Sequence, residues 1–438
     1  MYDVIIVGAG PGGCITAKTL EDSGLKVCVL DRKPKNLIGE KVCGDAIGKH
    51  HLDFLNRKVG LGYPEEELKT KIRGVKIFSP DRKTFFTTET REGGYTINRL
   101  LFGQRLISEL GDVNLLADTD VVGIKGRDVI IRREGKVDKI QAGVLVDASG
   151  MQAVIRRQID SPYIEKDIDK RDIAICHREI RDYRFEDQEY CHIYLDQDMS
   201  SGGYIWVFPE GGHTNIGLGV KYPINPKERF YHYIKGKPFE DSKIINAGGG
   251  AVPVRRTIDS VVAFQNSLGF MFIGDAACQA NPIHGGGIGQ AMTGGYLAGS
   301  VIKKVIDDIS LEGLWDYNLA WMKDYGSRSA GLDLFRILLQ SLTNKQINFG
   351  MKNRLIREED LLKTSEGGNL ELGIADKLTR AMKGITRVNL LNNLRFTANK
   401  MQEIKNLYRD YPSPDGFFEW RSRVRKLYQE INSVLKNK

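Results

Sequence analysis

The sequence lacks the patterns that hold metal ions, disulfides or membrane-spanning helices. Among 438 residues there are six cysteines and seven histidines. The cysteines form no C-x-x-C pair and the histidines show no metal-ligand spacing, which argues against a zinc site and a disulfide scaffold. No apolar run reaches the roughly 18 residues of a membrane-spanning helix. The first predicted strand begins at Tyr2, so we expect no signal or transit peptide and a cytoplasmic protein.

The charge is moderately positive and spread along the chain. A net charge of +8 suits an anionic partner such as nucleic acid, a membrane surface or a phosphorylated substrate. No nucleic-acid-binding motif accompanies it, so we expect no nucleic-acid partner, and peripheral contact with a membrane stays open. A hydrophobic content of 41% is enough for a sizeable core and roughly two to three domains.

A glycine-rich turn follows the first predicted strand. Residues 4–7 are a continuous apolar run, typical of a buried parallel strand. Gly8, Gly10 and Gly13 then form G-x-G-x-x-G, and Gly12 lies within the same turn. The first glycine permits a tight turn, the second lets the backbone approach a pyrophosphate, and the third allows close packing of helix on strand. The start of the following helix favours negative charge. This segment predicts a dinucleotide site.

The second predicted strand, residues 27–30, ends in an acid. Asp31 follows it, and its carboxylate is placed to bond the adenosine ribose hydroxyls. We assign Arg32, the next residue, to the same site. A strand, a helix and a second strand with a terminal acid are strong evidence for a dinucleotide. They do not distinguish NAD from FAD.

A second glycine cluster lies in "FIGDAACQANPIHGGGIGQAM". A predicted strand, residues 268–273, precedes Asp275, and a helix follows the glycines at 285–287. This resembles the second fingerprint of FAD enzymes of the glutathione-reductase-like class. The resemblance implies that Asp275 bonds the ribityl chain and that the backbone of Gly286, Gly287 and Ile288 meets the flavin edge. The helix dipole would stabilise negative charge on reduced flavin. The predicted cofactor is therefore FAD.

Three shorter segments agree with this class. "VLVDASGMQAVIRR", residues 144–157, resembles the mid-chain motif of flavin hydroxylases and reductases. "YTINRLLFGQRL" resembles the helix that carries a flavin-contacting arginine, which is Arg99 in this sequence; a surface cation is the alternative. Val122, in "TDVVGI", would lie against the adenine, with Val121 nearly as good a candidate.

Two further segments narrow the class. "GEKVCGDAI" follows the second strand, and "YIWVFPEGGHTNIGLG" has the form Y-x-W-x-F-P. Together they resemble the geranylgeranyl reductase family over roughly residues 1–305. That family reduces isolated double bonds of prenyl chains, and its archaeal members act on digeranylgeranylglycerophospholipids. The resemblance implies that Cys43, followed by Gly44, lies near the isoalloxazine, where its thiol either donates a proton or shapes the pocket.

The Y-x-W-x-F-P segment reads as a strand with one aromatic face. Alternation places Tyr204, Trp206 and Phe208 on the same side, where with Pro209 they would line an apolar slot for the substrate. Ordinary core packing is the alternative. Glu210 departs from the basic residue that many family members carry there.

These observations predict an α/β fold. It consists of a glutathione-reductase-like FAD-binding Rossmann domain, an inserted antiparallel-sheet substrate domain and a helical C-terminal region. A leucine-rich stripe from Leu332 to Leu342 fits a core helix or a helix bordering a lipid tunnel. The predicted division is 1–70, 95–155 and 262–306 for FAD, 71–94 and 156–261 for the substrate, and 307–438 for the helices.

The predicted function is FAD-dependent saturation of geranylgeranyl chains, most simply in archaeal-type membrane lipid precursors. Cys43, a flavin-bound water and the flavin itself compete as the proton donor. No second nucleotide signature identifies the electron donor, so NADPH, ferredoxin and other reductants stay open. One alternative is a flavin monooxygenase or halogenase of the same fold. Another is a non-enzymatic prenyl-lipid escort protein, against which the complete second fingerprint argues.

Overall fold

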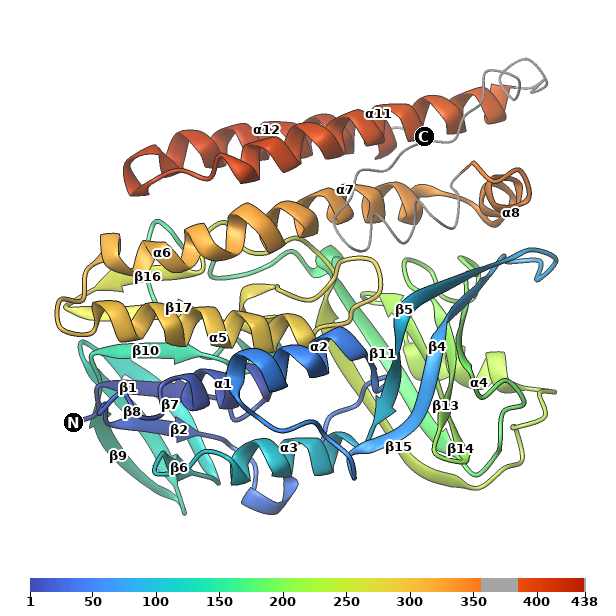
Figure 1. Cartoon of the computed structure of the whole chain (residues 1–438). Helices are drawn as coiled ribbons and strands as arrows, with labels where there is room; N and C mark the ends of the chain where they lie inside the picture. The colour runs from blue at the N-terminus through green and yellow to red at the C-terminus, as the bar shows by residue number, and fades with distance from the viewer. Residues whose placement is uncertain (356–384, 437–438) are drawn as a thin grey trace.

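Two large sheets lie side by side, and a layer of helices covers them in the computed structural model (Figure 1). The structure describes residues 1–355 and 385–436. Residues 356–384 and 437–438 belong to the predicted helical C-terminal region and lie outside the described residues. The rest of that region, from residue 307 on, is helical as predicted. No helix among the described residues is long and apolar enough to cross a membrane.

The first sheet has six strands in the order β16-β17-β10-β1-β2-β6. Its pairs are parallel except for β16 with β17. The buried apolar runs predicted at residues 4–7 and 27–30 form β1 and β2. The carboxyl ends of the parallel strands meet at one edge, the usual place for a ligand in this kind of sheet. The strands are β1 (Val4–Val7), β2 (Val27–Leu30), β6 (Asn114–Leu116), β10 (Val144–Asp147), β16 (Val262–Gln265) and β17 (Leu268–Phe272).

Two helices that follow the glycine turns pack directly on each other. They are α1 (Pro11–Thr19) and α5 (Ile288–Val305). A Cβ on Gly295 of α5 would lie 2.3 Å from the carbonyl oxygen of Gly12 on α1, so only a hydrogen atom fits there. Helix α3 (Arg99–Ser108) also contacts α1. A small antiparallel sheet completes this part, with strands β7 (Thr119–Lys125), β8 (Asp128–Arg133) and β9 (Lys136–Gln141).

The second sheet has eight strands in the order β15-β11-β14-β13-β12-β4-β5-β3. It is antiparallel as predicted, except that β12 and β4 run parallel. These two strands are far apart in the sequence and are not joined by a hairpin, so nothing obliges them to run in opposite directions. Helices α2 (Lys49–Phe54) and α4 (Pro226–Ile234) flank this sheet. Its strands are β3 (Ala46–Gly48), β4 (Leu68–Phe78), β5 (Phe85–Ile97), β11 (Ile173–Arg181), β12 (Tyr190–Tyr194), β13 (Ile205–Glu210), β14 (His213–Lys221) and β15 (Ile244–Pro253).

Sheet membership runs slightly beyond the predicted substrate segments. Strand β4 starts before residue 71, β5 continues past residue 94, and β3 also joins the second sheet. The chain therefore enters this sheet twice, once through residues 46–97 and once through residues 173–253. The division into domains at the predicted positions stays a prediction.

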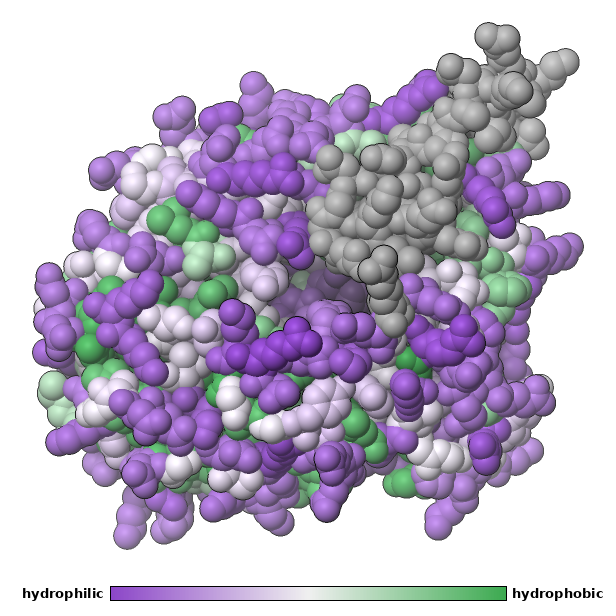
Figure 2. All heavy atoms as spheres, in the orientation of Figure 1, coloured by the Kyte–Doolittle hydropathy of each residue, from purple (hydrophilic) through white to green (hydrophobic). Residues whose placement is uncertain are grey.

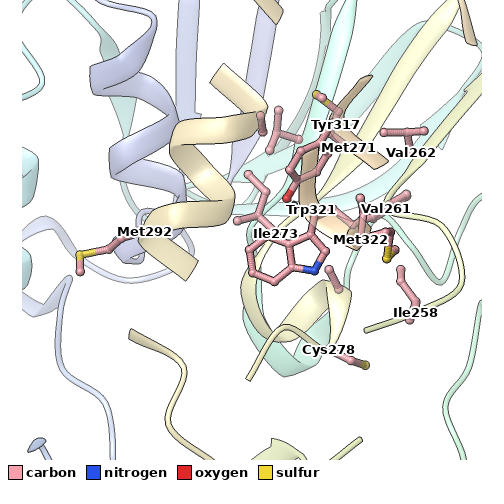
Figure 3. Packing of buried hydrophobic residues seen from close by; sticks show 14 of the residues in the cluster. Ile258, Val261, Val262, Met271, Ile273, Cys278, Met292, Tyr317, Trp321 and Met322 are labelled. Carbon is pink, nitrogen blue, oxygen red and sulfur yellow. Dashed lines mark hydrogen bonds between the residues drawn. The ribbon is translucent and has the colours of Figure 1, made fainter. Parts of the chain in front are cut away.

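The C-terminal helices rest on the first sheet and on one another. Tyr317 and Trp321 of α6 lie beside Met271 and Ile273 (Figure 3). The Trp321 indole N–H donates to Thr257 Oγ1 (3.0 Å), which anchors the buried ring. The predicted leucine stripe lies on α7 up to its C-cap residue, Leu342, and Thr343 then begins a new helix with a capping box. The helices are α6 (Leu311–Trp321), α7 (Ser327–Ser341), α8 (Asn344–Lys352), α11 (Ile385–Arg409) and α12 (Phe417–Lys436).

Candidate flavin and substrate site

In the first glycine turn, one glycine has free space around it and the others pack closely against neighbouring atoms. Gly8 has φ +108°. A Cβ on Gly13 would lie 1.9 Å from the carbonyl oxygen of Gly8, which is the predicted close packing of helix on strand. A Cβ on Gly12 would meet Ile273 and the backbone of Ala291, so Gly12 serves the contact between α1 and α5. Nothing lies within 4 Å of a Cβ on Gly10. Gly10 is therefore the point where a ligand can approach the backbone at the start of α1.

The acid after β2 is held beside this turn. Asp31 Oδ2 accepts from the backbone N–H of Ala9 (2.8 Å), and Oδ1 accepts from the N–H of Lys33 (2.9 Å). These bonds fix the carboxylate at the sheet edge and leave further lone pairs for a ribose. Arg32 is exposed. On β7, Val122 is 41% exposed whereas Val121 packs against the core, so the choice between them for the adenine contact stays a prediction.

The second fingerprint brings its acid and its glycines together. A Cβ on Gly287 would lie 3.4 Å from Asp275 Oδ1, although twelve positions separate the two residues. Gly285 has φ +67°, and the N–H of Gly286 donates to His284 Nδ1 (3.1 Å). Helix α5 begins at Ile288. The acid, the glycine backbone and the helix start therefore lie together at the sheet edge and form one surface.

Arg99 and Lys41 add positive charge beside this surface. Arg99 is 9% exposed, and its Nε–H has no hydrogen-bond partner in the structure. A buried guanidinium donor without a partner is suited to a ligand group. Lys41 Nζ donates to Asp275 Oδ2 (2.8 Å), and this carboxylate raises the pKa of Lys41. Gly39 has φ +106° and packs on the backbone of Arg99. The segment that carries Cys43 therefore contacts α3 through Gly39 and the second fingerprint through Lys41.

The Cys43 segment rests on the aromatic strand β13. Cys43 is half-buried, and a Cβ on the next residue, Gly44, would lie 2.9 Å from the Phe208 ring. Trp206 and Phe208 belong to one buried cluster with Tyr204 at its edge. The predicted sharing of one face by the three rings is therefore confirmed. The Tyr204 hydroxyl donates to the carbonyl of His284 (2.6 Å), which ties this strand to the glycine loop of the flavin fingerprint.

The motif proline and the adjacent acid have structural surroundings of their own. Pro209 is buried in β13 opposite Thr214. Glu210 is 1% exposed and forms an ion pair with Lys69 of β4. Its other carboxylate oxygen, Oε2, has no hydrogen-bond partner, and burial raises the pKa of Glu210. Lys69 thus neutralises the charge of Glu210, the residue that departs from the family pattern.

Several residues of this region were not identified from the sequence. His51 lies directly against Gly289 in the first turn of α5, and burial lowers the pKa of its ring. Asp45 is 3% exposed, has φ +61°, and burial raises the pKa of its carboxyl to about 7. Asn215 is fully buried beside it. The sequence signals were weak: a histidine in a short helix, an acid after a glycine, and a polar residue in a strand.

The geometry fits a dinucleotide with a flavin at one end. Gly10, the fixed Asp31 carboxylate, and the surface formed by Asp275 with the glycine loop lie along the carboxyl edge of one parallel sheet. A hollow on the face drawn in Figure 2 lies where Figure 1 draws the N-terminal end of α5 and helix α2. The aromatic face of β13 adjoins the same edge through Tyr204.

Two family models match the chain. The FAD binding domain matches residues 1–68, and the geranylgeranyl reductase catalytic domain matches residues 172–252. The digeranylgeranylglycerophospholipid reductase of Sulfolobus acidocaldarius is 38% identical over 99% of this chain and 99% of its own length. The enzyme of that name from Methanothrix thermoacetophila is 30% identical over 84% of this chain and 95% of its own length.

Solved structures share the fold. A geranylgeranyl bacteriochlorophyll reductase-like protein from Thermoplasma acidophilum superposes with a TM-score of 0.75 at 22% identity, covering 90% of this chain and 99% of that one. A flavin-dependent brominase, in a triple-mutant form, gives a TM-score of 0.63 at 18% identity, covering 86% and 97%. The near full-length identity to the Sulfolobus enzyme, with both family matches, shows that this chain belongs to the geranylgeranyl reductase family of FAD-dependent oxidoreductases.

Proposed function

We propose that this enzyme saturates isolated double bonds of geranylgeranyl chains in archaeal-type membrane lipid precursors. The observation that carries the proposal is the position of the Cys43 segment. Lys41 joins it to the flavin-fingerprint acid Asp275, and Gly44 packs on the aromatic ring of Phe208. These contacts support a position for the Cys43 thiol between the expected flavin end and an apolar surface. The names of the Sulfolobus and Methanothrix relatives support the same substrate class.

An isolated trisubstituted alkene has no carbonyl group that could polarise it, so its reduction needs a proton as well as a hydride. The reduced flavin, when bound, supplies the hydride for one alkene carbon. We assign the proton for the other carbon to the Cys43 thiol. Tyr204, Trp206 and Phe208, with Pro209, are assigned to hold the prenyl chain, because their face is apolar and adjoins the Cys43 segment through Gly44.

The FAD contacts are assigned on the same geometry. Gly10, at the start of α1, and the fixed carboxylate of Asp31 suit the pyrophosphate and the ribose. Arg99 offers a free buried N–H, and Asp275 faces the glycine loop. The full proposed set is Gly8, Gly10, Gly12, Gly13, Asp31, Arg32, Cys43, Gly44, Arg99, Val122, Asp275, Gly286, Gly287 and Ile288. Within it, Gly8, Gly12 and Gly13 act through packing of the turn.

The test is an anaerobic single turnover. The flavin is reduced with dithionite, a digeranylgeranylglycerophospholipid is added, and flavin reoxidation and product mass are followed. We expect the product to gain two mass units per reduced bond. Cys43→Ser and Cys43→Ala should both bind FAD and reoxidise roughly 10²- to 10⁴-fold more slowly, the range for loss of a general acid. Near-wild-type rates in both variants would assign the proton to water or the flavin instead.

The same experiment separates the reductase from a monooxygenase or halogenase. A reductase oxidises its flavin with lipid in the absence of oxygen, whereas those enzymes need oxygen. Dithionite replaces the external electron donor, for which NADPH and ferredoxin are both candidates. A lipid substrate and a net charge of +8 further support peripheral contact with an anionic membrane. Co-sedimentation with anionic vesicles at low salt, lost with neutral vesicles, is the expected result.

A further inference from the structure

One buried side chain, Asn215 of β14, connects the Cys43 segment to the aromatic strand. Its Oδ1 accepts from the Trp206 indole N–H (2.9 Å). Its Nδ2 donates to the carbonyl oxygen of Cys43 (3.0 Å) and to Asp45 Oδ2 (3.1 Å). A carboxamide has two N–H groups on its nitrogen, so both donors are used. The three partners lie in two segments that are separated by more than 150 residues.

The segment that Asn215 holds does not have an intrinsically favoured shape. Asp45 has φ +61°, which is unfavourable for a residue other than glycine and persists only where the surroundings stabilise it. The backbone carbonyl of Asp45 accepts from the N–H of Ile97, and its side chain bonds Asn215. Arg178 Nη2 lies 4.0 Å from Asp45 Oδ2, which is a long ion pair and beyond hydrogen-bond distance. The Asn215 amide is therefore a principal polar anchor of residues 43–45.

The other end of the carboxamide fixes the indole. Trp206 packs over Gly217, where a Cβ would lie 2.0 Å from the ring, so the ring plane is set by close contact. The hydrogen bond to Asn215 also fixes which edge of the indole ring faces β14. The same amide thus fixes the position of a ring that is assigned to the substrate slot and the position of the Cys43 backbone carbonyl.

We propose that Asn215 is a positioning residue for the reaction, locking the Cys43 segment onto the Trp206 face of the substrate slot. This inference rests on the proposed function, in which the thiol must face a prenyl chain held on that slot. Asn215 itself touches neither the thiol nor the expected substrate position; it acts through the Cys43 backbone and the indole ring.

The decisive variant is Asn215→Asp. In its ionised form the new side chain keeps the size of Asn215 and the acceptor for Trp206, but it lacks both N–H donors. The carbonyl of Cys43 then loses its N–H partner, and two carboxyl groups face each other at positions 45 and 215. We expect iodoacetamide to alkylate Cys43 roughly 10- to 100-fold faster, as read from peptide masses, because the segment opens more often. Single-turnover reoxidation should slow by a similar factor.

A reciprocal exchange separates positioning from stability. The double variant Asp45→Asn with Asn215→Asp again places one amide and one carboxyl group at the buried positions 45 and 215. The carbonyl of Cys43 still lacks the N–H donor that Asn215 provides in the wild type. We expect the melting temperature to recover towards wild type while alkylation stays fast and turnover stays slow. Asn225→Asp, at the exposed N-cap of α4, makes the same chemical change elsewhere and should leave all three readouts unchanged.

Two results would overturn the inference. One is alkylation and turnover in a folded Asn215→Asp variant that match the wild-type protein. The other is a double variant that recovers slow alkylation and fast turnover together, since the bond to the Cys43 carbonyl would then be unnecessary. Failure of the proposed acid role looks different: Cys43→Ala would turn over normally, while the alkylation difference between wild type and Asn215→Asp would persist.

Discussion

Alanine at Gly10 should weaken FAD binding without harming the fold. Gly10 has φ −73° and ψ 177°, which alanine adopts without strain, and nothing lies within 4 Å of the added Cβ. Glycine-to-alanine changes at compatible positions stabilise by about 0.4–1 kcal/mol through the unfolded chain. We therefore expect the flavin-free Gly10→Ala protein to be as stable as wild type or slightly more stable.

The same methyl group would stand where the pyrophosphate approaches the backbone. A hydrogen bond to a charged group contributes about 1.5–3 kcal/mol, so displacement from one amide predicts a roughly 10- to 100-fold weaker Kd for FAD. Because bound FAD stabilises the folded state by mass action, the FAD-loaded variant should melt below the FAD-loaded wild type at equal, limiting FAD.

Gly13→Ala provides the contrasting control. Its Cβ would lie 1.9 Å from the carbonyl oxygen of Gly8, so backbone must move, and overpacking of this kind costs about 1–3 kcal/mol or more. We expect this variant to lose stability even without FAD. Urea unfolding of the flavin-free proteins and titration by flavin fluorescence provide the two measurements. Wild-type FAD affinity in Gly10→Ala, or equal loss of flavin-free stability in both variants, would refute this assignment of the two glycines.

Three other changes test the substrate side. Gly217→Ala should lower the free energy of unfolding by about 1–3 kcal/mol, because its Cβ would lie 2.0 Å from the Trp206 ring. The control Gly219→Ala, whose Cβ would have its nearest neighbour at 4.0 Å, should not lower it. Equal urea midpoints for the two variants would contradict this prediction. Trp206→Ala should keep flavin absorbance but slow prenyl-lipid turnover, with a stability loss of about 3–5 kcal/mol seen in thermal melts; unchanged turnover in the folded variant would count against the slot. Burial raises the pKa of Asp45 from 3.8 to about 7, so the folded state binds more protons than the unfolded state between these values and loses stability as pH rises through them. Asp45→Asn should therefore gain stability over wild type at pH 8 relative to pH 5, and an equal difference at both pH values would show that the carboxyl does not titrate in this window.

The glycine turns and the aromatic alternation could be predicted because their physics is local. Gly8 and Gly13 touch each other within one turn, and that contact follows from the spacing alone. The shared face of Trp206 and Phe208 follows from the two-residue period of a strand. In both cases the residues concerned lie within one short segment of the chain.

The polar partners of the Cys43 segment could not be predicted because they depend on tertiary contacts. Lys41 reads as an ordinary surface cation until Asp275, 234 positions later, is placed beside it. Asn215 reads as a polar residue in a strand, which usually faces solvent. Glu210 stands out in the sequence only as a departure from the family pattern, and its partner Lys69, 141 positions away, is identified by the structure alone.

The order in which the chain visits its two sheets explains why these segments meet. The chain leaves the parallel sheet after β2 to form β3, β4 and β5, and it leaves again after β10 to form β11 to β15. Both departures start at the carboxyl ends of strands next to β1, which is the edge where the first glycine turn and Asp31 lie. A sheet built only from these two excursions must adjoin that edge, because each excursion also returns to the same parallel sheet. Topology therefore brings the aromatic face of β13 and the segment of Cys43 to the sheet edge that is proposed to bind the flavin. Individual side chains such as Asn215 then fix the positions of these two segments relative to each other.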